Sequence, residues 1–75
     1  MNNKPIKYEV AIYNKDVRQQ VKIGERHKEL TDDWADIHYI VVTAASDQEA
    51  RAKISVKYPA AKGFVIEHVA KAMEE

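Results

Sequence analysis

The chain has 75 residues, enough for one domain with a thin core but not for two. Hydrophobic residues make up 45% and charged residues 32%, with only two glycines and two prolines, which excludes a wholly disordered or fibrous chain. The absence of cysteine excludes a disulfide framework and a thiolate zinc site. Twelve basic and twelve acidic side chains give a formal net charge of zero, so the overall charge does not favour a nucleic acid as partner.

The N-terminal sequence MNNKPIKYEV lacks the apolar segment of a signal peptide, and no apolar run approaches the roughly 18 residues that cross a bilayer. We therefore expect a cytoplasmic protein without a membrane partner. Residues 31–50 carry five acidic and no basic side chains, whereas the segments on either side are mildly basic. This distribution fits a solvated surface or, alternatively, complementary patches used in self-association.

The first predicted element is a strand over residues 6–13, where apolar side chains occupy every second position. Residues 17–23 alternate in the same way. A two-residue turn at Asn14 and Lys15 would place both apolar sets on one face of a sheet. We therefore predict a β-hairpin over residues 6–23, in preference to the alternative of one helix over residues 15–30.

A polar connection is predicted over residues 25–37, after Gly24 ends the second strand. Within it, Thr31 and the two following aspartates resemble the cap and first turn of a short helix that carries Trp34 inward. Trp34 is then a plug for the edge of the core or, alternatively, an anchor for a partner. In residues 38–45, HYIVVTAA, apolar side chains occupy both the odd and the even positions. Both faces of the strand would then be apolar, which predicts a central strand covered on both sides.

A helix is predicted to begin after Ser46, because Ser46 and Glu49 form a capping box. It must end before Pro59, which cannot continue it. The helix would bury a stripe that recurs every fourth residue, namely Ala50, Ile54 and Tyr58. The alternating residues 54–58 could instead form a strand, but the strong cap and the helix propensity of the preceding residues favour the helix.

The last predicted element is a strand over residues 64–70. Alternation places Phe64, Ile66 and His68 on its inner face and Val65, Glu67 and Val69 on its outer face. The whole chain, residues 1–75, is then a single α+β domain of order β-β-β-α-β. We expect a four-stranded, mainly antiparallel sheet with one helix packed on one face.

The run from the strand at residue 38 through Ser46-Asp47-Gln48-Glu49-Ala50-Arg51 to Tyr58-Pro59 and the next strand resembles an element of small phage and environmental α+β proteins of unassigned function. The resemblance covers residues 38–70. It consists of a strand, a capped helix and a strand, so it supports the predicted fold. It implies no functional residue.

The best candidates for chemistry are the carboxylates Asp32, Asp33 and Asp36 with the imidazole of His38. These groups could hold a cation if the loop folds back on itself. Their spacing matches no standard metal motif, and the aspartates also fit a capped turn and a solvated surface. No glycine-rich phosphate loop and no nucleophile with a base at a recognisable spacing occurs. We therefore predict no metal, no cofactor and no enzymatic activity.

The sheet face away from the helix is the predicted functional surface. One helix can cover only one face, so the other needs a cover, and a second copy of the chain is the simplest one. We expect a small protein-interaction or assembly protein that acts as a homodimer through Tyr13, Tyr39, Val41, Val65 and Val69. The alternative is weak binding of single-stranded nucleic acid, in which tyrosines stack on bases and basic residues contact phosphates, through Tyr13, Arg18, Lys22 and Tyr39.

Overall fold

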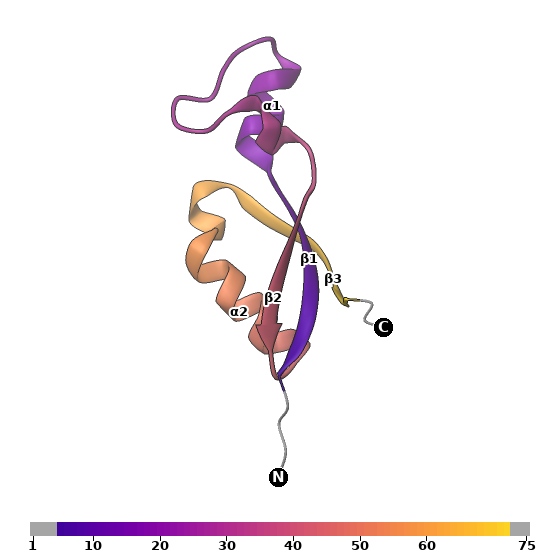
Figure 1. Cartoon of the computed structure of the whole chain (residues 1–75). Helices are drawn as coiled ribbons and strands as arrows, with labels where there is room; N and C mark the ends of the chain where they lie inside the picture. Colours follow the sequence, from indigo (N-terminus) through magenta and orange to yellow (C-terminus); the bar gives the residue numbers. More distant parts are fainter. Residues whose placement is uncertain (1–4, 73–75) are drawn as a thin grey trace.

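The computed structural model describes residues 5–72 and shows an α+β fold with a three-stranded antiparallel sheet and two α-helices (Figure 1). The elements in chain order are β1 (Ile6–Asn14), α1 (Lys15–Lys22), the 3-10 helix η1 (Asp32–Ala35), β2 (His38–Ala44), α2 (Asp47–Lys57), the 3-10 helix η2 (Ala60–Lys62) and β3 (Phe64–Lys71). Within residues 5–72, no helix is both long enough and apolar enough to cross a membrane.

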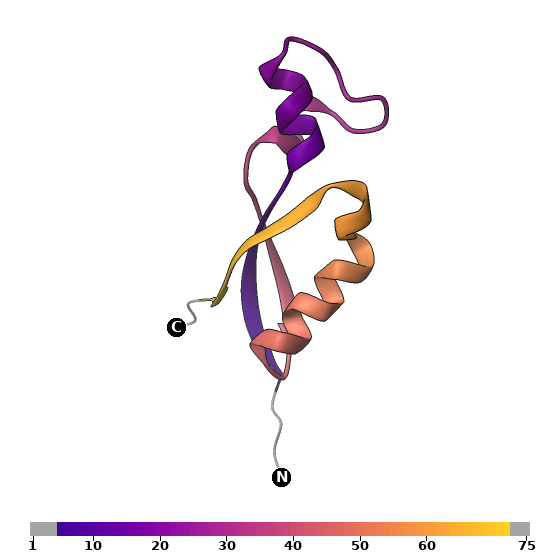
Figure 2. The same cartoon turned by 180° about the vertical axis from the view of Figure 1, so that it is seen from behind.

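The strand β1 is the centre of the sheet, whose strand order is β2-β1-β3. Both neighbours run antiparallel to β1, with Val10 opposite Ile40 of β2 and opposite Val69 of β3. The helix α2 packs along one face, whereas α1 lies beyond one end of the sheet and covers neither face (Figures 1 and 2). The α+β class and the antiparallel sheet are as predicted, but the predicted count of four strands and one helix is wrong.

The predicted hairpin over residues 6–23 is wrong because its second half is the helix α1. Asn14 keeps extended backbone angles, φ −112° and ψ 117°, and caps the helix instead of forming a turn. Val17 and Val21 are separated by one helical turn as well as by four strand positions, so their spacing fits both structures. The helix stops at Lys22, so the alternative of one helix over residues 15–30 is also wrong.

The segment His38–Ala44 forms the predicted strand, but β2 lies at an edge of the sheet and not at its centre. Because the segment after Asn14 forms a helix, β1 has a free side and pairs with both β2 and β3. Only one face of β2 is covered, so the prediction of a strand covered on both sides is wrong. Its burial alternates from residue to residue along the strand.

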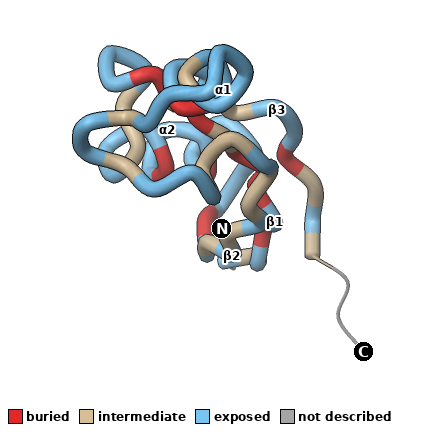
Figure 3. Tube along the Cα trace, turned by 90° about the horizontal axis from the view of Figure 1, so that it is seen from above, coloured by how far each residue is buried: buried red, intermediate tan, exposed pale blue. Residues whose placement is uncertain are grey.

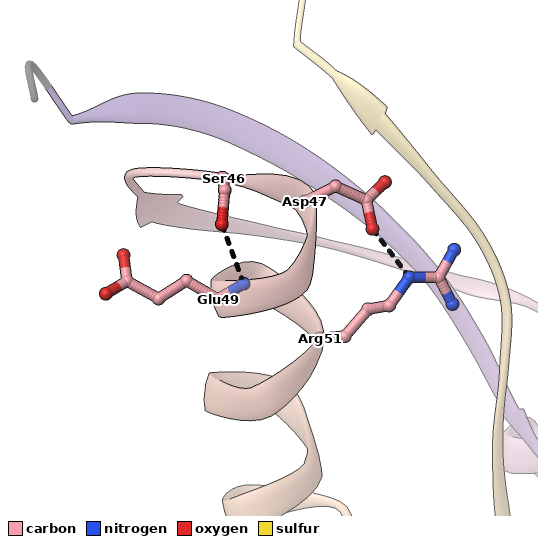
Figure 4. Close-up of polar contacts among 4 residues, drawn as sticks. All are labelled: Ser46, Asp47, Glu49 and Arg51. Carbon is pink, nitrogen blue, oxygen red and sulfur yellow. Dashed lines mark hydrogen bonds and ion pairs between the residues drawn. The ribbon is translucent and has the colours of Figure 1, made fainter.

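The helix α2 begins at the predicted capping box (Figure 4). The Ser46 hydroxyl accepts a hydrogen bond of 3.1 Å from the Glu49 amide, and the Glu49 carboxylate accepts one from the amide of Ala45. Asp47 and Arg51, one turn apart, form an exposed ion pair of 2.7 Å. The helix continues to Lys57, so the alternative of a strand over residues 54–58 is wrong.

The core lies between α2 and the sheet, where Val10 and Ile12 of β1 are fully buried. Ala50 and Ile54 of α2 pack against them, and Tyr58 is half-buried at the end of the same stripe, as predicted. Figure 3 shows buried positions on β1, α2 and β3, whereas the segment after α1 is mostly exposed. The hydrophobic core therefore uses one face of the sheet only.

The pairing of β3 with β1 contains a bulge. Ala11 pairs with His68, but the next residue, Ile12, pairs with Ile66, so Glu67 is an extra residue in β3. Residues that follow Glu67 are therefore shifted to the opposite face from the one that simple alternation predicts.

Asn14 is a fully buried polar residue at the junction of β1 and α1, and its side chain links this junction to η2. Its side-chain oxygen accepts hydrogen bonds from the amides of Asp16 and Val17 at the start of α1, with lengths of 2.9 and 3.0 Å. Its amide group donates a 2.9 Å bond to the carbonyl of Lys62 in η2. The backbone amide of Lys15 adds a 2.8 Å bond to the carbonyl of Gly63, so the β1–α1 junction is linked directly to the start of β3.

The cap and the cross-link can be separated by substitution at Asn14. Asn14→Asp keeps an oxygen that caps α1 but replaces the donor to the Lys62 carbonyl with a second oxygen. We expect both Asn14→Asp and Asn14→Ala to lower the free energy of unfolding, each by about 1–3 kcal/mol, because the part-buried bond to the Lys62 carbonyl is lost. Urea unfolding followed by circular dichroism measures this. An unchanged stability of Asn14→Asp would mean that the cap alone accounts for the role of Asn14.

Candidate functional site

The candidate site is the face of the sheet that α2 leaves uncovered, which we call the open face. The register places Ala11 between Tyr39 on β2 and His68 on β3, and Glu9 between Val41 and Ala70. Paired residues of neighbouring strands share a face. The open face therefore consists of Tyr39, Val41 and Thr43 from β2, Lys7, Glu9, Ala11 and Tyr13 from β1, and Val65, His68 and Ala70 from β3.

The most exposed apolar side chains of the open face lie on β2. Tyr39 is 65% exposed and Val41 is 57% exposed, which is high for large apolar residues in a strand. Tyr13 and Val65 are half-buried, and Ala11 between the outer strands is buried. The exposed apolar surface is thus concentrated towards the β2 edge and does not extend evenly over the whole face.

Val69 does not belong to this face, contrary to the prediction. The bulge at Glu67 moves it to the covered face, where it is paired with Val10 and is only 8% exposed. His68, which was predicted on the inner face, is exposed on the open face for the same reason. Of the five predicted interface residues, four share the open face: Tyr13, Tyr39, Val41 and Val65.

The residues predicted for the alternative of nucleic-acid binding lie on three elements: Tyr13 on β1, Arg18 and Lys22 on α1, and Tyr39 on β2. The Arg18 guanidinium lies 3.7 Å from the centre of the Tyr13 ring, which is a cation–π contact between α1 and β1. Arg18 also donates a 2.8 Å bond to the carbonyl of Ala35 in η1. Lys22 follows Arg18 by one helical turn and is exposed, so the two cations share a face of α1. Both interactions of Arg18 are internal and also hold α1 in place.

The acidic cluster of the connection lies on the surface. Among residues 5–72, no three side chains of the metal-binding types come together. His38, instead of facing the carboxylates, has its Nε2 atom 3.0 Å from the carbonyl oxygen of Asp33 and stacks on the Trp34 ring at 4.1 Å. Asp32, Asp33 and Asp36 are exposed. Their observed environment is that of a capped turn on the surface.

Trp34 packs inward, as predicted, in a cluster of aromatic rings. Phe64 meets it edge-on at 5.2 Å, and the Tyr58 ring lies 5.5 Å from it. These residues also line a groove of about 370 Å³ between the connection and the C-terminal end of α2, together with Leu30 and Val56. Because the rings contact one another, the cluster explains how η1 is held against β3 and α2. The polar lining of the groove comes from His27, Glu29, Lys57 and Lys62.

The free edge of β2 is a feature that the sequence analysis missed. It was hidden because the alternation of residues 17–23 predicted another strand in the sheet, which would have left β2 in an interior position. The ε-amino group of Lys53, from α2, donates a 2.7 Å bond to the carbonyl of Thr43. This bond shows that a backbone group of β2 is available to donors other than β1.

No family model, curated protein or solved structure matches this chain.

The position of Val69 predicts a difference between two valines. Val69→Ala should lower the free energy of unfolding by about 1.5 kcal/mol or more, because it removes buried methyl groups from the core. The control is Val56→Ala on α2, where the side chain is 83% exposed and the expected change is within about 0.5 kcal/mol. Thermal or urea unfolding compares the two variants. Equal effects would contradict the placement of Val69 in the core.

Proposed function

We propose that this chain is a small, non-enzymatic interaction or assembly protein that acts as a homodimer, and that the open face is its binding surface. The observation that carries the proposal is the joint exposure of Tyr39 and Val41 on a face that no helix covers. Tyrosine is common at protein interfaces because it adds a large apolar area and a polar group at a small cost in conformational entropy.

The size of the chain supports self-association. A domain of this length buries a smaller fraction of its surface on folding than a larger domain does, and here the core uses one face of the sheet. Covering the exposed apolar residues of the other face would add stability that the monomer lacks. A second copy supplies an identical apolar patch, and a two-fold axis lets each patch meet the other.

The charges near the patch favour a protein over a nucleic acid as partner. Glu9 lies next to Val41 in the register, and Lys7 is the only lysine or arginine that the strands place on the open face among the described residues. A phosphate backbone requires several unpaired cations along its path. The open face has a nearly balanced charge, which a self-complementary protein interface tolerates.

Replacing Val41 with Lys should convert the dimer into a monomer, because two charges would face each other in the desolvated centre of the contact. We expect wild type to sediment as a dimer at high micromolar concentration and Val41→Lys as a folded monomer. The matched control is Val56→Lys, which places the same charge on an exposed valine of α2, away from the open face. A monomeric wild type, or equal effects of the two substitutions, would contradict the proposal.

The second candidate function is binding of single-stranded nucleic acid, which the contact of Arg18 with Tyr13 favours. The Arg18 guanidinium lies over the Tyr13 ring, and Lys22 lies one helical turn further along α1. Together with the exposed Tyr39 ring on β2, these groups provide surfaces for stacking on bases and charges for binding phosphates. In this case Tyr39→Ala and Arg18→Gln should each weaken binding of a labelled single-stranded oligonucleotide roughly tenfold.

Fluorescence anisotropy at low and moderate salt measures this binding, and the affinity of wild type should fall as salt rises. Arg51→Gln is the control, since Arg51 pairs with Asp47 on α2. The absence of any anisotropy change with wild type at 50 mM salt would remove this function from consideration.

A further inference from the structure

We propose that two copies of the chain join through the free edges of their β2 strands, which pair antiparallel to form one continuous six-stranded sheet. This inference rests on the proposed homodimer and specifies its contact: the apolar patches of the two open faces meet side by side along a shared edge, and not face to face. It concerns the hydrogen-bonding edge of β2, whereas packing of two open faces would use side chains alone. The two arrangements make different predictions.

The direction of the backbone groups of β2 follows from two observed bonds. Lys7 and Thr43 are directly opposite each other, and the Lys7 carbonyl accepts a 2.9 Å bond from Ala72, on the side of β3. The Thr43 carbonyl accepts from Lys53 of α2. Lys7 and Thr43 therefore form a non-hydrogen-bonded pair, in which each residue directs its backbone groups away from the other.

Alternation along an antiparallel ladder extends this result to the rest of the strand. Val41 opposite Glu9 and Tyr39 opposite Ala11 are also non-hydrogen-bonded pairs. Tyr39, Val41 and Thr43 thus direct their N–H and C=O groups to the free edge. The same three residues carry their side chains on the open face, so the edge and the exposed apolar patch coincide.

These groups complement a second copy of themselves. In an antiparallel pair with the two-fold axis at Val41, each Val41 exchanges two hydrogen bonds with the other, and each Tyr39 does so with Thr43 of the other copy. This register uses all outward groups of the three residues. It also places Val41 beside Val41 and Tyr39 beside Thr43 on the open face, where cross-strand pairs stabilise a sheet.

The two edges of the sheet differ in the structural features that normally prevent pairing with another strand. The outer strand β3 contains the bulge at Glu67 and ends at Lys71, and bulges and charged residues both discourage pairing at an edge. The seven residues of β2 include no proline, lysine, arginine or carboxylate. The bulge and the charged residue that discourage pairing are therefore present on β3, whereas β2 has neither.

The charges at the two ends of β2 are also complementary. Asp33 and Asp36 precede the strand and are exposed, while Lys53 lies at its other end, against Thr43. Antiparallel pairing brings the start of each strand beside the end of the other. The acidic end of one copy then approaches Lys53 of the second copy, which must release the Thr43 carbonyl when Tyr39 of the other copy donates to it.

The experiment removes the N–H group that Thr43 directs to the free edge and leaves the apolar side chains of Tyr39 and Val41 intact. Thr43→Pro removes a donor that the monomer does not use, and proline is tolerated on an edge strand when its nitrogen faces solvent. We expect its dimer dissociation constant in sedimentation to rise at least about 30-fold, because one hydrogen bond is lost on each side of the axis. Thr43→Val is the matched control, since it keeps the N–H and should keep the dimer.

The outcomes separate this inference from the proposed function. A dimer that survives Thr43→Pro but is lost with Val41→Lys would overturn edge pairing and retain a contact between open faces. A wild type that is monomeric at high micromolar concentration would overturn both, and the edge would then be free for a strand of another protein.

Amide hydrogen exchange in the wild type gives a second measurement that needs no variant. The amides of Val41 and Thr43 should become at least about tenfold more protected from dilute to concentrated solution. Those of Ile40 and Val42, which bond to β1, serve as the reference because they are protected in both states. Equal exchange of Val41 and Thr43 at both concentrations would overturn edge pairing, even if Thr43→Pro fails to fold.

Discussion

The fold depends on the buried side chain of Asn14, which ends a strand, begins a helix and binds the segment before β3. A buried amide must satisfy its donors and acceptors, and Asn14 does so with the first turn of α1 and with the carbonyl of Lys62. Gly63 makes this approach possible. Its φ of 95° is in the left-handed region, and an added Cβ would lie 2.9 Å from the Asn14 oxygen and closer still to the Asp16 carboxylate.

The cross-link at Asn14 decides where the remaining elements lie. The chain leaves β1 as a helix beyond the end of the sheet, so no hairpin partner forms on either side of β1. Both sides of β1 are then taken by the later strands β2 and β3. With α1 outside the sheet, α2 is the helix that packs on it, and the opposite face stays open.

A second set of contacts holds the α1 end of the molecule to the rest. Trp34 stacks on His38 and meets Phe64 and Tyr58, so η1, β2, β3 and the end of α2 share one aromatic cluster. Arg18 links α1 to the same region through the Ala35 carbonyl and lies over the Tyr13 ring. These contacts leave Tyr39 and Val41 as the exposed apolar residues of the open face, next to the edge of the sheet that β2 forms.

Local physical chemistry determined much of this fold from the sequence alone. The capping box at Ser46, the apolar stripe of α2 and the stop at Pro59 are encoded within a few residues, and so are β1 and the start of β3. Alternation also predicted correctly that Tyr13, Tyr39, Val41 and Val65 share the open face. The valines of residues 17–23, however, have a spacing that suits both a strand and a short helix, so periodicity could not distinguish them.

Only the tertiary structure resolved that ambiguity: it shows Asn14 as the cap of α1, with its side chain also bonded to the carbonyl of Lys62, 48 residues later in the chain. The bulge at Glu67, which moves Val69 into the core, likewise depends on the pairing of β3 with β1 and has no local signal. The position of β2 at an edge follows from the same long-range pairing. Short-range patterns therefore determined the elements and most of the candidate face, whereas contacts between distant segments decided the strand order, the register and the free edge.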